Sequence, residues 1–302
     1  MATNAERIVC TWAHSVRLDV STNRSFLVPG AGTSRAIFEW KSHVARRSEA
    51  PESKSEAGMA SAARFGFWAA TGTALSTLIT FGIAIATPPL SGPLCRAGCF
   101  SYPYLDIEAR FPRDYVWLFP AILATLFYLA FMVALHARMG PGGKLFGELG
   151  LALSVMAALT LVGDYFVQLA VVQPGVRNAE ADGISLLSQY NPHGLFIALE
   201  ELGYLLLSLS LVCVVPALSR ATRLERAIRW LFLTGFVVNV LSLCWFLLRY
   251  GHQREYLFEI TVISVDWLVL IVCGFLAAAV FRPARIGRCP RVTARAASNF
   301  PV

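Results

Sequence analysis

Six long apolar stretches with almost no charged residues occupy the chain between about residues 65 and 281. A helix needs roughly 20 apolar residues to cross the hydrocarbon core of a bilayer, and each stretch has about that length. In lipid, every backbone polar group must be hydrogen-bonded within the chain, which a helix achieves by itself. The sequence therefore predicts an all-α polytopic membrane protein, a bundle of six transmembrane helices, with spans at about 65–87, 116–136, 146–172, 195–218, 230–249 and 257–281.

The charge of the chain follows the same division. Charged residues make up 15% of the sequence, against about 25% in an average soluble domain, and they lie at the ends and in short connections. The net charge of +7 comes from basic residues that flank the apolar stretches. Orientation in the membrane and anionic lipid headgroups explain that placement better than nucleic acid, which we do not expect as a partner.

Basic residues also predict the orientation. With the N-terminus inside the cell, 20 of the 26 Lys and Arg residues fall on the cytoplasmic side, as the positive-inside rule requires. We therefore expect both termini to be cytoplasmic, in a cell membrane that is either a plasma membrane or a bacterial inner membrane. Six basic residues then lie outside: Arg96, Arg110, Arg113, Arg177, Arg249 and Arg254.

The terminal segments differ from the membrane domain, which we place at residues 63–283. Residues 1–62 have no apolar run long enough for a signal peptide, so we expect the first span to act as the insertion signal. Their polar composition, especially at 46–56, predicts irregular backbone; alternatively, Met59 is the true start. Residues 284–302 form a basic cytoplasmic tail suited to anionic lipid.

Five carboxylates fall inside the predicted spans, and all lie in the outer half of the bilayer. At about 1.5 Å of rise per residue, they are within roughly 3–14 Å of the outer boundary. Their spacing places Glu259, Asp266 and Cys273 on one face, and likewise Glu200, Tyr204 and Ser208, and Asp164 with Gln168. Because a carboxylate facing lipid is costly, we expect these acids to turn inward. The candidates are Asp164, Glu200, Glu201, Glu259 and Asp266, with Arg249, Arg254 and His193 as available counter-charges.

Two interpretations of these acids remain open. Repulsion between them requires that at least one is protonated or matched by a cation. The first interpretation is therefore an outward-facing polar site for a proton, a metal ion or a small cationic solute, lined by Asp164, Glu200, Glu201 and Asp266. In the second, a structural network joins three helices, and the chain is a structural or signalling subunit. The sequence also leaves open whether the chain forms a homo-oligomer.

The first outer loop contains Cys95 and Cys99. On the oxidising side of a cell membrane, such a pair favours a short disulfide over a metal pair or two free thiols. The loop at 190–194 precedes the fourth span and is either a helix cap, through Asn191, or a lid over the carboxylates.

An intramembrane enzyme is the least favoured class. It would need a metal or nucleophile near the acids, for which the sequence offers His193, Ser208 and Tyr204. The chain has no His-Glu-x-x-His and no Gly-x-Ser-x-Gly sequence, and no His lies deep in a span to ligate haem. We predict no cofactor.

Overall fold

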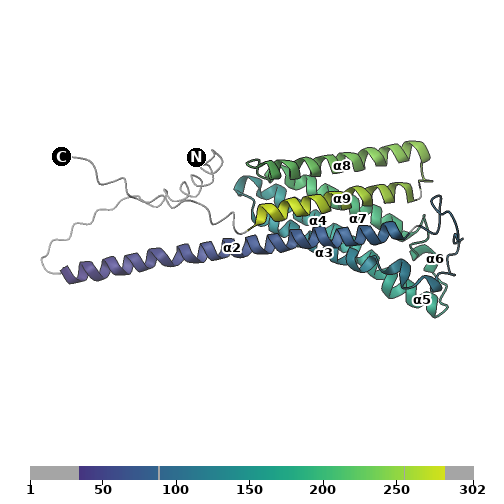
Figure 1. Ribbon diagram of the computed structural model, residues 1–302, viewed down its shortest axis with the longest axis horizontal. Helices are drawn as coiled ribbons and strands as arrows, with labels where there is room; N and C mark the ends of the chain where they lie inside the picture. Colours follow the sequence, from purple (N-terminus) through teal and green to yellow (C-terminus); the bar gives the residue numbers. More distant parts are fainter. Residues whose placement is uncertain (1–33, 88, 255, 283–302) are drawn as a thin grey trace. The chain divides into compact units, whose positions relative to one another are not determined.

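The computed structural model describes residues 34–87, 89–254 and 256–282. The chain separates into two compact units, one made of residues 64–281 and the other of residues 1–63 and 282–302. All regular structure in the described residues is helical (Figure 1). The predicted cytoplasmic tail at 284–302 and the first 33 residues of the predicted N-terminal segment lie outside the described residues.

The long helices are α2 (Ser34–Ala86), α3 (Leu118–Ala137), α4 (Lys144–Val167), α7 (Leu195–Val214), α8 (Arg223–Tyr250) and α9 (Tyr256–Phe281). Shorter elements connect them: η1 (Glu108–Arg110), η2 (Arg113–Tyr115), η3 (Pro141–Gly143), the π-helical turn η4 (Gln168–Val172), α5 (Gln173–Arg177), α6 (Ile184–Leu187) and η5 (Val215–Ala217). Six helices are long and apolar enough to cross a membrane, so the predicted fold class is confirmed. The membrane-spanning part of α2 is Ala60–Ala86.

The structure departs from the predicted boundaries in three places. Helix α8 begins at Arg223, where Thr222 forms a capping box with Glu225, and not at residue 230. Helix α2 already covers residues 46–56, where composition predicts irregular backbone; Ala, Glu, Lys and Arg are strong helix formers, and the segment uses them. The third span was predicted to stop before Pro174. Instead the helix passes through η4 into α5, where Pro174 lies in the first turn and its missing N–H removes no helical hydrogen bond.

Within residues 64–281, α7 is the central helix and contacts α4, α8 and α9. The three helices that carry the acids therefore touch, which spacing alone leaves open. Small residues bring α2 close to α9: a Cβ atom on Gly274 would lie 2.8 Å from the Ala70 carbonyl oxygen and 2.8 Å from the Ala74 Cβ. Such close packing by small residues is a common means of association for helices in lipid.

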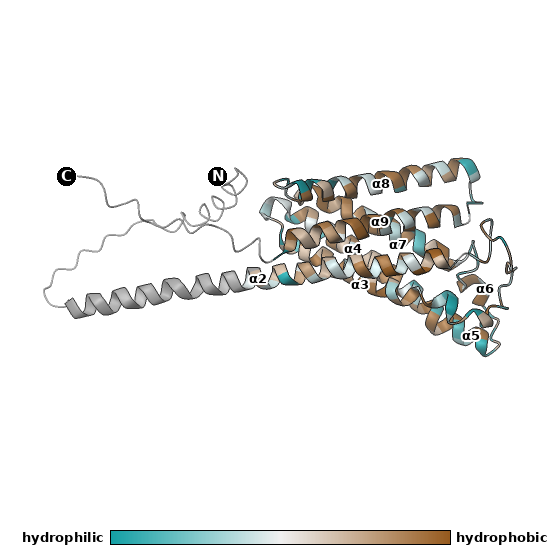
Figure 2. Cartoon of the chain, viewed as in Figure 1, coloured by the Kyte–Doolittle hydropathy of each residue, from teal (hydrophilic) through white to brown (hydrophobic). Residues whose placement is uncertain are grey.

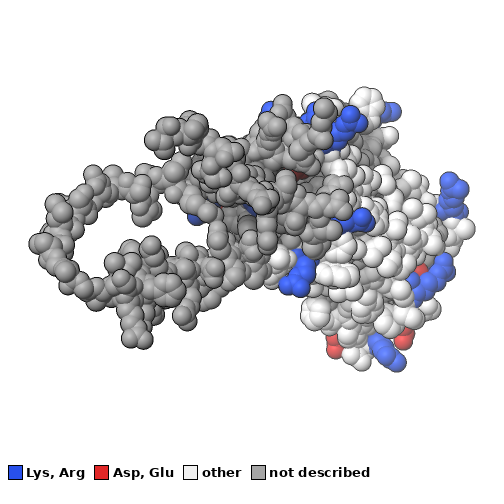
Figure 3. Space-filling model, turned by 60° about the vertical axis from the view of Figure 1, so that its left-hand side comes forward, with Lys and Arg blue, Asp and Glu red and all other residues white. Residues whose placement is uncertain are grey.

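The outer surface of the bundle is apolar, as lipid contact requires. Large aliphatic side chains point outward, among them Leu248, Leu159 and Ile85. Hydrophilic residues gather at the two ends of the bundle and on α5 (Figure 2). In Figure 3 the described surface shows a broad uncharged area between groups of Lys and Arg. We call the end that carries the C-terminus of α2 and the N-termini of α7 and α9 the disulfide end, because Cys95 and Cys99 lie in its loops.

Candidate functional site

Three buried acids from three helices meet near the disulfide end. Glu200 of α7 is completely buried, and Asp164 of α4 and Glu259 of α9 are nearly so. Glu200 interacts electrostatically with both of the others. Both oxygens of Glu200, Oδ2 of Asp164 and Oε2 of Glu259 are buried, and Glu200 and Glu259 lie close enough to share a hydrogen bond. We call these three residues the acid cluster.

Glu201, next to Glu200 in the chain, has a different environment. Both of its carboxylate oxygens accept hydrogen bonds from Arg254, one from Nε at 3.2 Å and one from Nη2. Arg254 is therefore the counter-charge at this end of the bundle. Arg249 points away from the acids, is exposed, and stacks over the ring of Tyr250, while His193 is exposed in its loop. Neither is brought to the acids.

Asp266 lies deeper in α9 and is also buried. Its Oδ1 accepts a hydrogen bond of 2.8 Å from Nδ2 of Asn239 in α8. The remaining oxygens of this pair, Asp266 Oδ2 and Asn239 Oδ1, are both buried without a partner. Asp266 therefore joins α8 to α9 at the middle of the bundle and does not belong to the acid cluster.

Aromatic side chains fill the space between these polar groups. The hydroxyl groups of Tyr165 and Tyr204 are hydrogen-bonded at 2.8 Å, and Trp267 Nε1 donates to the Tyr204 hydroxyl at 2.8 Å. Trp117, at the start of α3, packs edge-on against Tyr165 and Trp267. The rings hold one another in fixed positions, so the space they border has rigid walls.

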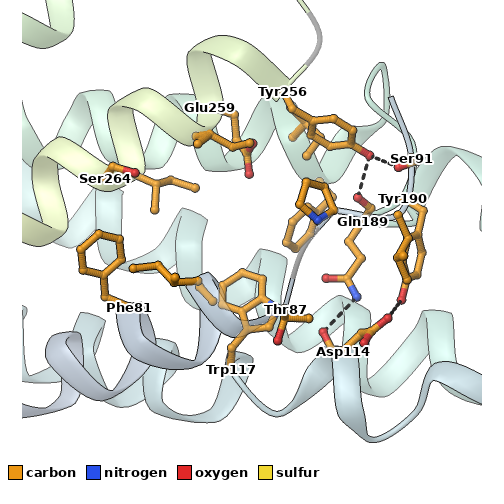
Figure 4. A pocket seen from close by; sticks show the side chains of 18 of the residues that line it. Phe81, Thr87, Ser91, Asp114, Trp117, Gln189, Tyr190, Tyr256, Glu259 and Ser264 are labelled. Carbon is orange, nitrogen blue, oxygen red and sulfur yellow. Dashed lines mark hydrogen bonds between the residues drawn. The ribbon is translucent and has the colours of Figure 1, made fainter. Parts of the chain in front are cut away.

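A cavity of about 380 Å³ lies beside the acid cluster at the disulfide end. Glu259 is on its wall, while the other four acids predicted from the sequence are not. Figure 4 shows the Glu259 carboxyl group turned into the cavity, with Trp117 and Asp114 approaching from the other side. The wall is otherwise aromatic and aliphatic, and its polar side chains are those of Thr87, Ser91, Asp114, Gln189, Tyr190, Tyr256, Glu259 and Ser264.

Hydrogen bonds between the loops and the neighbouring helix starts build the rim of this cavity. The hydroxyl groups of Ser91 and Tyr256 lie 2.6 Å apart, and Tyr256 also donates to the Gln189 carbonyl oxygen at 3.2 Å. Tyr190 donates its hydroxyl to Asp114 Oδ2 at 3.0 Å (Figure 4). Burial, together with the nearby Tyr115 and Asp114, raises the pKa of the Tyr190 phenol above its usual range, so this donor keeps its proton at neutral pH.

The loop ahead of α7 was predicted to be either a helix cap or a lid over the carboxylates. Tyr190 lines the cavity, as the lid interpretation requires. Asn191 does not cap α7, whose N-cap is Gly194 without a side-chain hydrogen bond; Asn191 Oδ1 instead accepts from the His193 backbone N–H at 3.0 Å. Gln168, predicted to share a face with Asp164, fastens this loop through the Leu187 carbonyl oxygen and the Gln189 N–H.

The first loop at this end is closed by a disulfide between Cys95 and Cys99. Near it, the Arg110 guanidinium lies over the Phe100 ring, and Phe100 packs edge-on against Tyr190. The disulfide loop is therefore connected to the cavity rim through the contact between Phe100 and Tyr190.

Sequence reasoning missed Asp114, Asn239 and the two tryptophans of the cavity region. Asp114 lies between Arg113 and Tyr115 at a helix start, where an acid is ordinary. A signal was available for Asn239, because a strongly polar residue in the middle of an apolar span is itself unusual. Trp117 and Trp267 gave none, since aromatic residues are common near the ends and on the buried faces of membrane helices.

No protein-family model, curated protein sequence or solved structure matches the chain. Among the described residues, no group of three or more His, Cys, Asp or Glu side chains is arranged to hold a metal ion. What the site does must therefore be argued from its own geometry.

Proposed function

We propose that this multi-pass membrane protein binds a small cationic solute in the cavity at the disulfide end, as a transporter or a solute-binding protein would. The observation that carries the proposal is the Glu259 carboxyl group, which is buried, lines the cavity and has other acids, Glu200 and Glu201, as its charged neighbours. An acid in this condition is costly inside a membrane. A bound cation would relieve that cost.

The charges around the cavity favour a cation over an anion. Both ionisable acids of the wall, Asp114 and Glu259, are negative when charged, and the wall includes no Lys, Arg or His side chain. Behind Glu259, the carboxyl groups of Glu200 and Asp164 add to the negative potential. Asp114 is partly compensated by Arg113, whose Nε lies 3.7 Å from Oδ1. A positive ligand at Glu259 is therefore attracted mainly by Glu259 and the acids behind it, because the low dielectric of the site screens little.

The acid cluster also supplies a way to remain stable without ligand. Two carboxylates at close range cannot both be charged without a large electrostatic cost, so a proton shared between Glu200 and Glu259 neutralises one of them. A cation that enters the cavity takes over this role. We therefore propose that binding of the solute releases a proton from the pair.

The orientation predicted from the basic residues would open the cavity toward the outside of the cell. The disulfide between Cys95 and Cys99 supports this orientation, since disulfides persist on the oxidising side of a cell membrane. The solute would then be taken from the external medium or periplasm.

Thermal unfolding of the purified chain in detergent tests the proposal directly. The ligands are Na⁺, K⁺, Mg²⁺, Ca²⁺ and a series of small organic ammonium ions, and the variant is Glu259→Gln. A ligand at 100 times its Kd stabilises the folded state by about 2.7 kcal/mol. The matched control is Glu148→Gln, because Glu148 is an exposed acid that pairs with Lys144 on α4.

A cation that stabilises the wild type and the Glu148→Gln variant, but not the Glu259→Gln variant, would support the proposal. If no cation shifts the unfolding of the wild type, the proposal fails. The second candidate, a structural or signalling subunit, would then be favoured by the two acids whose partners are on neighbouring segments, Glu201 with Arg254 and Asp266 with Asn239.

A further inference from the structure

We infer that the ligand of this cavity is an organic ammonium ion with an aromatic or bulky apolar group, and not an inorganic cation. The inference rests on the proposed function and goes further by naming the ligand class. It depends on three features of the cavity: its volume, the rings that form its wall, and the placement of its two acids.

The volume is too large for an ion alone. A cavity of about 150 Å³ with apolar walls is enough to hold benzene, and the cavity beside Glu259 measures about 380 Å³. It therefore has room for a six-membered ring, a short linker and an ammonium group. A bare metal ion would leave most of the apolar wall in contact with water or empty.

Aromatic rings surround the space on several sides. Phe81 of α2 packs edge-on against Trp267 with ring centroids 5.7 Å apart, and Trp117 lies 6.4 Å from both Trp267 and Phe196. The faces of such rings attract an ammonium ion, and their surfaces also accept an apolar group. Because each ring is supported by others, little conformational entropy is lost when a ligand enters.

The placement of the two wall acids favours one ammonium group at Glu259 over a metal ion shared with Asp114. Figure 4 shows Glu259 and Asp114 on different sides of the cavity, separated by rings. Around Glu259 the wall consists largely of Ile260, Ile263 and Trp267, whereas Ca²⁺ requires six to eight oxygen ligands. Asp114 already accepts the Tyr190 hydroxyl. Arg113 Nε also lies 3.7 Å from Asp114 Oδ1, whereas the charged neighbours of Glu259 are themselves acids, Glu200 and Glu201. Glu259 is therefore the anchor for the ammonium group.

These features give the ligand an orientation. The ammonium group donates to the Glu259 carboxylate, and the apolar group lies against the rings of Trp117 and Phe81 on the opposite wall (Figure 4). A charged group paired in a low-dielectric site and an apolar group buried among rings contribute separately to affinity. Removing either should weaken binding without abolishing the contribution of the other.

Isothermal titration of the full chain in detergent tests the inference with matched probes. They are 2-phenylethylammonium, methylammonium, Na⁺, Ca²⁺ and 2-phenylethanol, the last being a neutral analogue that also enters detergent micelles. The wall variants are Trp117→Leu and Phe81→Leu, so that a failure of one to fold does not end the test. Trp245→Leu is the control, because Trp245 is an exposed tryptophan of α8.

We expect 2-phenylethylammonium to bind more tightly than every other probe. Its affinity should fall about 5- to 30-fold in Trp117→Leu or Phe81→Leu, as expected for the loss of one desolvated cation–π or stacking contact, fall at least as much in Glu259→Gln, and stay unchanged in Trp245→Leu.

The contrary outcomes separate the two proposals. If Na⁺, Ca²⁺ or methylammonium binds as well as 2-phenylethylammonium and needs Glu259, the cation site stands and the inference about the organic ligand is wrong. If 2-phenylethanol binds as well as the ammonium probe in both wild type and Glu259→Gln, the cavity takes apolar molecules and both proposals fail. Wall variants that leave the affinity for 2-phenylethylammonium unchanged would also overturn the inference.

Discussion

The pair formed by Asn239 and Asp266 gives the sharpest prediction about stability. Asn239 Nδ2 donates to Asp266 Oδ1 at 2.8 Å, and the other oxygen of each side chain is buried without a partner. If Asp266 is protonated at Oδ2, that O–H can donate a second hydrogen bond to Asn239 Oδ1, and both unpartnered oxygens are then satisfied. Asp266 also interacts electrostatically with the hydroxyl groups of Tyr204 in α7 and Tyr128 in α3. Neither of them is a cation that could neutralise a charged Asp266.

The consequence is that Asp266→Asn and Asn239→Leu should differ although they change the same pair. An asparagine at 266 supplies the second donor permanently, so we expect a change of less than about 1 kcal/mol in the free energy of unfolding. Asn239→Leu removes a hydrogen bond worth about 0.6–1.7 kcal/mol in a membrane protein and leaves a buried acid unsatisfied at about 1–3 kcal/mol. Together these give a loss of about 2–5 kcal/mol.

Denaturant or thermal unfolding in detergent measures both variants, and the double variant Asn239→Leu/Asp266→Leu completes a cycle. Replacing both polar partners with apolar groups is often nearly neutral, so the double variant should recover most of the loss, and the coupling should be visible as non-additivity. Equal destabilisation by Asp266→Asn and Asn239→Leu would refute the reasoning, because it would mean that Asp266 must be charged and is matched by a cation.

Three further predictions concern other parts of the bundle. Gly274→Ala should destabilise the fold by about 1–3 kcal/mol through overpacking against α2, whereas Gly82→Ala, where an added Cβ meets nothing within 4 Å, should not; thermal unfolding of both variants checks this. Arg254→Gln should destabilise by about 1–3 kcal/mol because it leaves the buried Glu201 carboxylate without its donor, and adding Glu201→Gln should restore most of the loss in the same assay. Because the pKa of Tyr190 is raised on folding, its contribution to stability is present at neutral pH and is lost as the pH rises through about 10; unfolding measured at about pH 9 and 11 should show a smaller loss in Tyr190→Phe.

The sequence was sufficient for the spans because their signal is local. Length and hydropathy place α3, α7 and α9 within a few residues of where the structure has them, and α8 at its C-terminal end. The exception at Pro174 is instructive. A proline was taken as a stop, but a helix that changes to a π-turn at Gln168–Val172 and restarts at Gln173 accepts a proline in its new first turn. Whether the helix continues past Pro174 depends on packing and cannot be predicted from hydropathy.

Helical spacing was also sufficient for which acids turn inward, but not for which partners they find. Arg249 and Arg254 both follow the apolar part of α8, and the sequence does not indicate which of them pairs with an acid. The structure separates them at Gly251, whose φ of 58° ends the helix in a conformation that favours glycine. Arg249 is left on the exposed last turn of α8, and the chain that follows carries Arg254 to Glu201. One backbone turn decides the pairing.

The five acids then fall into two groups that membrane energetics treats differently. Glu201 and Asp266 have polar partners on neighbouring segments. These hydrogen bonds lower the cost of burying the two acids and hold the segments of the bundle together. Asp164, Glu200 and Glu259 have mainly one another, an arrangement that weakens the fold unless protons or a cation neutralise it. Proteins commonly keep such unfavourable arrangements of charge at functional sites, where they serve binding or catalysis. Of these three acids, Glu259 is the one on the cavity wall. A cation from outside the protein can therefore neutralise the acid cluster only through the cavity. The electrostatic cost of the acid cluster thus favours the binding of a ligand there.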